Sequence, residues 1–502
     1  MNEEFGQWLI PFCLLLPFSG ALLALVVPVA WKNAVGLVVS FLLFGVILLL
    51  AVTVMENGVL SLSLGGWDPP LGIGLRADGL AMVFVLLTGL VGVPVGIYAA
   101  CWYSAGDEGK RATELFWPLW LFVWGAMNGL FLSVDLFNVY VLLEVLGLAA
   151  VGLAVLSGQS AALIAGLRYL LAALVGSMAY LMGVALLYAS YGFLDGRLLG
   201  EAITGGWTDQ LAFALLIVGL LIKTALLPFH FWLPGAHSSA TPPVSAILSA
   251  LVVKASFYLI LRLWVDVFGG TVTYAAGQML GWLGAVAIVW GSYQALRQEH
   301  LKRMVAHSTV SQIGYLFLMF PLLTVAANDQ WAAQVWTGGV YQVLAHGLAK
   351  AALFLAVGIV VLAMGNDRKD SLLNMVGRMP MTTFALALAG VSLIGLPPSG
   401  GFVAKWMFLE ASLASGQWWW APMIVWGSFL TAGYIFMVLR MAFAPAPKEK
   451  RLRRVPPALQ ITALGLAVMA ILIGLRAEEI LQLLEVGLPG SVEVLSEEGG
   501  YE

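Results

Sequence analysis

The sequence predicts an all-α integral membrane protein with about 14 transmembrane helices. The chain has 502 residues, of which 61% are hydrophobic and only 10% are charged, whereas soluble domains carry about 25% charged residues. Its apolar stretches reach the roughly 20 residues that a membrane-spanning helix needs. They are also too continuous for the alternating strands of a membrane barrel. These observations exclude a soluble enzyme, a nucleic-acid binder and a disordered chain.

The distribution of Lys and Arg predicts the orientation of these spans. When the N-terminus is placed outside, 15 of these residues fall in inner loops and 3 in outer segments, as the positive-inside rule requires. We therefore expect a multi-pass protein of the inner (plasma) membrane with both termini on the outer side. The acidic start MNEEFG is unlike a signal peptide. The predicted spans cover residues 7–29, 33–55, 78–101, 115–133, 136–156, 169–190, 209–232, 242–264, 274–296, 304–324, 333–364, 381–411, 418–443 and 457–475.

No stretch of the chain resembles a soluble domain. We expect an N-terminal three-helix segment at 1–114, five-helix units at 115–265 and 266–443, and a final part at 444–502 with a basic inner loop, the last helix and an acidic tail. Cys13 and Cys101 offer no disulfide framework and no metal spacing. Dinucleotide and phosphate-binding glycine motifs are absent. The sequence therefore predicts no cofactor, no metal and no nucleic-acid partner for this chain.

Three charged residues fall near the middle of predicted spans. A charge at mid-bilayer costs about 2.5–3.5 kcal/mol, so such residues are functional candidates. Glu144 lies roughly 12 Å and Lys223 roughly 21 Å from the outer edge, and Lys254 lies roughly 18 Å from the inner edge. Glu144 and Lys223 come from different helices at similar depth, which predicts a buried ion pair. The alternative is a static pin between two helices, although Lys254 adds a cation that a pin does not need.

Two predicted spans are interrupted by proline, and each carries a lysine. Pro228 follows Lys223 by five residues, and Pro397 with Pro398 precedes Lys405. Proline removes a backbone donor and breaks the helix, and broken helices with an ionisable residue are common in transporters. If helices 4–8 and helices 9–13 form two five-helix units, both lysines fall on the fourth helix of their unit. An odd number of spans per unit makes the two units inverted repeats, as in many transporters. A simple packing kink is the alternative for each proline.

Histidines complete the set of candidate residues. His346 and Lys350 are spaced i,i+4 on one helix face, and neutral histidine beside lysine can pass a proton. The alternative is that both bond to the backbone. His230, His237 and His307 lie near the inner ends of their spans and are weaker candidates for a proton entrance, or else interfacial histidines. The nearby cations Lys302 and Arg303 are best interpreted as an orientation signal.

Several long blocks resemble the antiporter-like, proton-translocating subunits of respiratory complex I, Mrp-type cation/proton antiporters and energy-converting hydrogenases. The blocks are DLFNVYVLLEVLG, KTALLPFHFWLPGAHSSATPPVSAILSALVVKASFY, HLKRMVAHSTVSQIGY, HGLAKAALFL and LIGLPPSGGFVAKW. The resemblance covers nearly the whole chain. It implies 14 helices with two inverted repeats, other membrane subunits as partners, and a mid-membrane relay. The relay residues that it implies are Glu144, Lys223, Lys254, His346, Lys350 and Lys405.

Two positions depart from the family pattern. Gln342 stands where many members carry a second histidine, which weakens a two-histidine relay. His307 stands where many have tyrosine and could add a titratable group near the inner mouth. The segment GGWDPPLGIGLRADGLAMVF, the length and the missing lateral helix resemble the D subunit of Mrp-type antiporters. The PFHFWLPGAH block resembles complex I and hydrogenase members instead.

The sequence thus predicts a subunit, not catalytic by itself, that moves H⁺ within a larger complex. A Mrp-type Na⁺/H⁺ antiporter is the first interpretation, and an NADH-quinone oxidoreductase or hydrogenase is the second. A metabolite carrier and a non-translocating structural subunit are further alternatives. The exchanged cation, the direction of flow and the neighbouring subunits are left open.

Overall fold

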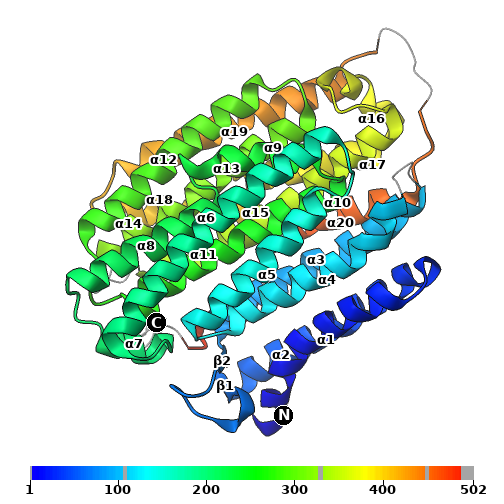
Figure 1. Ribbon diagram of the computed structural model, residues 1–502. Helices are drawn as coiled ribbons and strands as arrows, with labels where there is room; N and C mark the ends of the chain where they lie inside the picture. The colour runs from blue at the N-terminus through cyan, green and yellow to red at the C-terminus, as the bar shows by residue number, and fades with distance from the viewer. Residues whose placement is uncertain (1–2, 106–109, 326–331, 447–451, 477, 488–502) are drawn as a thin grey trace.

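The computed structural model describes residues 3–105, 110–325, 332–446, 452–476 and 478–487, which form an almost entirely helical bundle (Figure 1). Within these residues, 11 helices are long and apolar enough to cross a membrane. The predicted tenth, twelfth and fourteenth spans correspond to helices that are shorter or interrupted: α13 with α14, α17 with α18, and α20. This arrangement confirms the all-α membrane fold that the composition predicts.

The N-terminal part consists of three helices and a small hairpin. Strands β1 and β2 pair antiparallel, with Leu60 opposite Ala77. The hairpin marks one end of the bundle, which we call the hairpin side, and the opposite end is the far side. A bridge from Leu75 to Ser133 and a hydrogen bond from Gly79 N to Val486 O tie the hairpin region to later segments. The elements are α1 (Glu3–Val26), α2 (Val29–Asn57), β1 (Leu60–Ser63), β2 (Gly74–Ala77) and α3 (Gly79–Ala105).

The first predicted unit contains four long helical runs and one interrupted run. Its eighth predicted span is a continuous run in which π-helical turns flank an α-helix, at Leu248–Val252 and Leu263–Val267. The elements are α4 (Lys110–Leu132), α5 (Leu136–Ala154), α6 (Ser160–Tyr191), α7 (Gly196–Ala202), α8 (Trp207–Thr224), the 3-10 turn Phe229–Trp232, α9 (Leu233–Ser239), α10 (Pro242–Ile247) and α11 (Val253–Arg262).

The second predicted unit and the C-terminal part follow the same all-helical pattern. On the far side, His300 and Arg368 form a bridge between two loops of this unit. The elements are α12 (Tyr274–Arg297), α13 (Leu301–Phe317), α14 (Met319–Val325), α15 (Ala332–Met364), the 3-10 turn Lys369–Leu372, α16 (Met375–Arg378), α17 (Pro380–Ile394), α18 (Gly400–Ala414), α19 (Trp420–Phe443), α20 (Pro457–Leu472) and α21 (Glu478–Glu485).

Local chemistry explains several helix starts. Asp135 caps α5 by accepting from Asn138 N at 2.6 Å, and Asp195 caps α7 by accepting from Arg197 N at 3.0 Å. Thr273 and Ser399 cap α12 and α18 in the same way. Each cap satisfies a backbone donor that the first helical turn leaves free. The sequence therefore sets these helix starts through single side chains.

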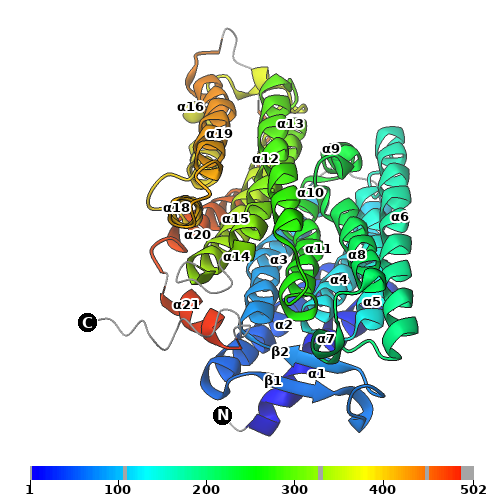
Figure 2. The ribbon, with the colours of Figure 1, turned by 90° about the vertical axis from the view of Figure 1, so that its left-hand side faces the viewer.

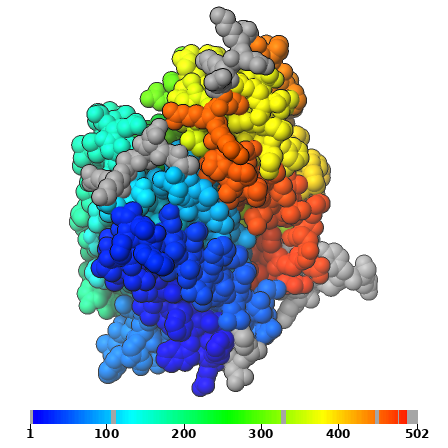
Figure 3. Space-filling view, turned by 90° about the vertical axis from the view of Figure 1, so that its right-hand side faces the viewer, coloured from blue at the N-terminus to red at the C-terminus, as the bar shows by residue number. Residues whose placement is uncertain are grey.

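Burial separates central helices from peripheral ones. Every residue in the most apolar window of 242–267 is buried, and 83% of that window is buried in α15. In α1, α2 and α19 the share is only 33–39%, and most of their exposed residues are apolar, as a lipid-facing surface requires. Figure 2 shows α11, α13 and α15 in the middle, with α6 and α8 on one flank and α18 and α19 on the other. Figure 3 shows the N-terminal helices beside the C-terminal ones on one face.

Two helix pairs pack with backbone against backbone. A Cβ on Gly176 of α6 would lie 2.7 Å from Gly219 O of α8, and one on Gly219 would lie 2.4 Å from Gly176 O. Gly284 of α12 and Gly314 of α13 show the same reciprocal contact, at 2.6 and 2.4 Å. Small residues permit such close approach of membrane helices. The first of these contacts also brings α8, which carries Lys223, against α6.

Candidate functional site

The first interrupted helix brings Lys223 to Glu144. Helix α8 ends at Thr224, Ala225 adopts a left-handed conformation (φ 60°), and the Leu227–Pro228 peptide is cis. Lys223 Nζ lies 3.7 Å from Glu144 Oε1 of α5, and the side chains are 7% and 24% exposed. The sequence prediction of a Glu144–Lys223 ion pair therefore agrees with the geometry.

Two glycines leave space beside Lys223, and an indole binds the backbone next to it. A Cβ on Gly147 of α5 would lie 3.8 Å from Lys223 Nζ, and one on Gly176 would lie 3.3 Å from Lys223 Cγ. The indole of Trp232 donates to Ile222 O at 2.9 Å, which satisfies a carbonyl at the end of α8. Because the Trp232 indole donates to this carbonyl, Lys223 does not fill that role and faces Glu144 instead.

Lys254 and Lys350 are joined by a set of hydroxyl and carbonyl groups. Lys254 Nζ donates to Ser249 O at 2.5 Å. Ser249 Oγ and Thr309 Oγ1 form a hydrogen bond of 2.8 Å between α11's run and α13. Thr309 Oγ1 donates to Val305 O at 3.1 Å, and Lys350 Nζ donates to the same oxygen at 3.0 Å. Lys350 Nζ also donates to Ser308 Oγ.

This hydroxyl bridge, consisting of Ser249, Ser308 and Thr309, was missed by the sequence reasoning. Its members are ordinary Ser and Thr residues in apolar helices, where the bland expectation is a bond to the preceding turn. Only the packing of α13 between the two lysine helices gives them a common role. The motif HLKRMVAHSTVSQIGY, however, contains two of the three residues and could have drawn attention to them.

A second set of groups leads from α15 to Lys405. Gln342 Nε2 donates to Gln312 Oε1 at 3.1 Å, and Gln312 Nε2 donates to Leu393 O at 3.4 Å. Lys405 Nζ donates to the same Leu393 oxygen at 2.8 Å and to Ile394 O at 2.9 Å. Gln342, which the sequence comparison treats as a departure from a histidine pattern, therefore occupies a connecting position. The ammonium also lies 4.3 Å from the centre of the Tyr315 ring and 3.2 Å from Ser428 Oγ.

His346 and His237 are fully enclosed, and their ring nitrogens accept and donate no hydrogen bond within the described part of the chain. An unpaired buried polar group is costly, and buried water commonly satisfies such groups. His346 lies between Gln342 and Lys350 on one face of α15, because the three residues follow an i, i+4 spacing. His346 therefore lies on the same helix face between the two sets of connected groups.

The weaker histidine candidates lie away from these connections. His230 and His307 are half-buried, and Nδ1 of each has no hydrogen-bond partner among the described residues. The nearby Lys302 differs from the expected orientation signal, because its side chain is buried and its Nζ donates to Ala240 O at the end of α9. Arg303 is exposed, as an orientation signal should be.

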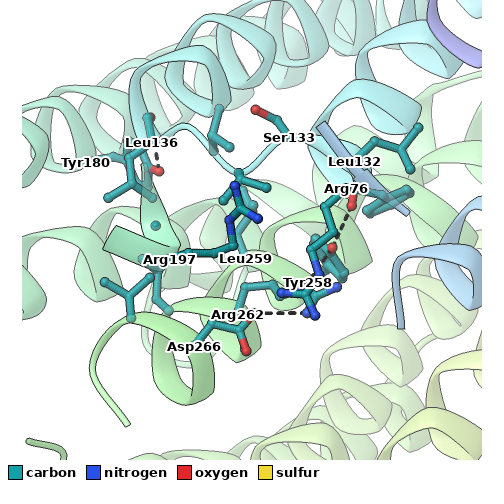
Figure 4. A pocket seen from close by; sticks show the side chains of 16 residues that line it. Arg76, Leu132, Ser133, Leu136, Tyr180, Arg197, Tyr258, Leu259, Arg262 and Asp266 are labelled. Atoms are coloured by element: carbon teal, nitrogen blue, oxygen red, sulfur yellow. Dashed lines mark hydrogen bonds and ion pairs between the residues drawn. The ribbon is translucent and has the colours of Figure 1, made fainter. Parts of the chain in front are cut away.

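An ion cluster on the hairpin side was also missed. Arg262 pairs with Asp78 and, at 2.9 Å, with Asp266, while Arg76 Nε lies 3.1 Å from Asp78 Oδ2. Arg76, Arg262 and Asp266 border a cavity of about 60 Å³ into which Arg197 also points (Figure 4). The spacing of Arg262 and Asp266 was the available sequence signal, since it is typical of a helical ion pair. Close by, burial raises the pKa of the Asp135 carboxyl.

These arrangements do not include a metal site. No group of three or more His, Cys, Asp or Glu side chains gathers in the described ranges in a way that could hold a metal ion. What the central groups offer chemically is a row of proton donors and acceptors on α8, α11, α13, α15 and α18.

Comparisons with known proteins agree with the fold. Residues 133–431 match a family described as NADH:quinone oxidoreductase/Mrp antiporter, transmembrane. The chain is 32% identical to the N subunit of an NADH-quinone oxidoreductase of Desulforudis audaxviator, with 94% of this chain and 98% of the relative covered. It is 29% identical to the D subunit of a Na⁺/H⁺ antiporter of Bacillus subtilis, with 89% and 87% covered. A chain of the Mrp complex from Dietzia superimposes with a TM-score of 0.86, at 26% identity and 99% coverage of both chains.

Proposed function

Because the chain belongs to the family of transmembrane proteins shared by NADH:quinone oxidoreductases and Mrp antiporters, we propose that it is the proton-translocating subunit of a multisubunit membrane complex. The proton moves along Glu144, Lys223, Lys254, His346 or Lys350, and Lys405. The observation that carries this proposal is the hydroxyl bridge between two buried lysines. Lys254 donates to the Ser249 carbonyl, and the Ser249 hydroxyl contacts the Thr309 hydroxyl. Lys350 donates to Ser308 Oγ and to the Val305 carbonyl that Thr309 also contacts. A merely structural subunit has no need for connected lysines at the most buried place in the bundle.

The initiating step takes place at the ion pair. When Glu144 lies near Lys223, its negative charge stabilises the ammonium, and when the carboxylate moves away the buried ammonium loses that support. The proton then passes toward Lys254. Protons enter from the far side, where His230, His237 and His307 lie. The Gln342–Gln312 connection leads onward to Lys405, from which the proton leaves.

We propose that the parent complex is a Mrp-type Na⁺/H⁺ antiporter in the plasma membrane and that this chain is its D subunit. The match to the D subunit of an antiporter over most of both chains supports this. The second candidate is the position of the N subunit in a quinone oxidoreductase, which the 32% identity to such a subunit favours. Purification of the tagged chain with its neighbours distinguishes the two. Small membrane subunits without redox cofactors support the antiporter, whereas flavin and iron–sulfur absorbance in the purified complex supports the oxidoreductase.

The hydroxyl bridge gives the sharpest test of proton movement. Thr309→Val keeps the side-chain shape but removes the hydroxyl between Ser249 and the Val305 carbonyl, while Thr309→Ser retains it. We expect Thr309→Val to slow proton transport by the whole complex in membrane vesicles about three- to tenfold, because a hydroxyl that can both donate and accept between the two lysine sites is lost. Thr309→Ser is the matched control and should keep most of the rate. Equal rates in both variants contradict a route through the bridge.

A further inference from the structure

A large cavity opens beside the second interrupted helix. It has a volume of about 550 Å³ and is bordered by residues of α17, α18 and α19. Among the described residues that line it, Lys405 contributes the only charge and Ser428 the only hydroxyl. The rest of the wall is apolar or aromatic, including Phe402, Trp406 and Phe429. This size and this lining are those of a small-molecule site.

The cavity faces sideways, toward the surroundings of the bundle. Trp406, Phe429 and Phe436 border it and are 49%, 66% and 69% exposed. Exposed aromatic side chains along α18 and α19 indicate a surface that meets hydrocarbon. A molecule dissolved in the membrane can therefore reach the cavity without passing through the bundle.

At the inner end of the cavity lies a cation without a counter-charge. Lys405 is 6% exposed, and its ammonium contacts two backbone carbonyls, the Ser428 hydroxyl and the Tyr315 ring. No carboxylate in the described ranges pairs with it, in contrast to Lys223. A buried charge favours an opposite charge nearby. The site thus combines an apolar channel from the membrane with one point of positive charge.

We propose that this cavity binds a single-chain membrane amphiphile with a carboxylate head, of the long-chain fatty-acid class. The carboxylate lies against the Lys405 ammonium and takes the place of the Ser428 contact, while the chain lies along α18 and α19. Binding itself is independent of the proposed function. Its consequence, inhibition of transport, rests on the proposed role of Lys405, because an amine held in an ion pair cannot release its proton.

Selection of the ligand depends on the head group. The apolar wall of the cavity binds a hydrocarbon chain no more strongly than the bilayer does, because lipid tails are as apolar as the side chains. The charged head, by contrast, finds no partner at this depth in lipid. The acid enters neutral and pairs with the neutral form of Lys405, to which the buried ammonium is converted when it loses its proton. The carboxylic O–H bond then breaks, an N–H bond forms, and a carboxylate–ammonium pair results. A long-chain alcohol of the same length cannot make this pair.

The test uses the intact complex in lipid nanodiscs and a palmitic acid that carries a photoactivatable diazirine. We expect crosslinks on peptides from α18 and α19. Lys405→Gln should lower the labelling at least about tenfold, since a buried charge pair is lost. Ala432→Trp fills the cavity without altering the lysine and should lower it similarly, whereas Leu430→Trp, on the same helix but outside the lining, should not. The corresponding diazirine alcohol is the head-group control.

Each outcome decides the proposal. Loss of labelling in Lys405→Gln and Ala432→Trp, with retention in Leu430→Trp and weak labelling by the alcohol, supports the site. Equal labelling by the acid and the alcohol, or labelling unaffected by Lys405→Gln, overturns it. Labelling that appears only after neighbouring subunits are stripped away also overturns it, since a neighbour then occupies the cavity. If the acid labels as expected but does not slow transport, the proposed role of Lys405 fails and the binding site stands.

Discussion

The two interrupted helices share a backbone design but place their lysines in different electrostatic settings. In each, a residue in the left-handed conformation, Ala225 or Gly395, ends the first half-helix, and a cis-proline peptide leads into the third residue after it. In each, the residue after the left-handed one donates to a carbonyl five positions earlier, which is a common helix C-terminal motif. The lysines, however, stand on opposite sides of the break: Lys223 before the first and Lys405 after the second.

This difference changes what stabilises each charge. At the first break the carbonyl of Ile222 accepts from the Trp232 indole as well as from Ala225 N, and Lys223 faces Glu144 instead. At the second break Lys405 itself takes the free carbonyls of Leu393 and Ile394. Neutral dipoles hold one ammonium and a carboxylate holds the other. One backbone design therefore accommodates either a lysine paired with a carboxylate or a lysine held by backbone carbonyls.

The largest expected effect comes from breaking the Glu144–Lys223 pair. Glu144→Ala and Lys223→Ala should each abolish ion-coupled transport by the complex. The transport rate should fall more than about tenfold, because the remaining partner is left buried without its counter-charge. Transport is measured as pH change in everted vesicles, and assembly is checked by copurification. Glu410→Ala changes an exposed glutamate of α18 and is the control. Normal transport in both pair variants refutes the role of the pair.

A smaller effect is expected at the connection that leads to the second break. Gln342→Leu removes the 3.1 Å hydrogen bond to Gln312 and should slow transport about three- to tenfold, in line with the net value of one buried hydrogen bond. Gln342→His retains a ring N–H donor and should keep more of the rate. If Gln342→Leu transports as fast as the unchanged protein, the route to Lys405 runs elsewhere.

The smallest effect on transport is expected outside both breaks. Asp78 is buried and binds Arg262 and Arg76, so Asp78→Asn should lower the melting temperature of the purified complex by about 5 °C or more through loss of a buried pair. Transport at low temperature should stay near normal. Arg197→Gln breaks the pair with Asp195, in which Arg197 Nε lies 3.7 Å from Asp195 Oδ1 and the arginine side chain is 45% exposed. It should change neither the melting temperature nor the transport rate. A transport loss in Asp78→Asn that matches that of Glu144→Ala removes the distinction between relay and scaffold.

The membrane fold and the places of the six residues of the proposed relay within membrane helices could be predicted from the sequence, because charges and prolines are conspicuous within apolar runs. The hydroxyl bridge could not, since Ser249 and Thr309 are 60 residues apart and ordinary in their own helices. Nor could the sequence separate Lys302 from Arg303, because only the packing of α13 against α9 decides which cation is buried. The opposite placement of Lys223 and Lys405 about their breaks is readable in the sequence, but its consequence depends on which side chain, Trp232 or Lys405, reaches the free carbonyls.

The reciprocal glycine contacts set a limit on how this protein can work. Where Gly176 touches Gly219, and Gly284 touches Gly314, main-chain atoms meet directly, so neither pair can slide or rotate without collision. Large rocking of one half against the other would have to carry each pair as a fixed block. The proposed transit of hydrogen ions in such a frame would depend on torsions of long side chains. These contacts favour a mechanism in which side chains move within fixed helices over one in which helices rotate.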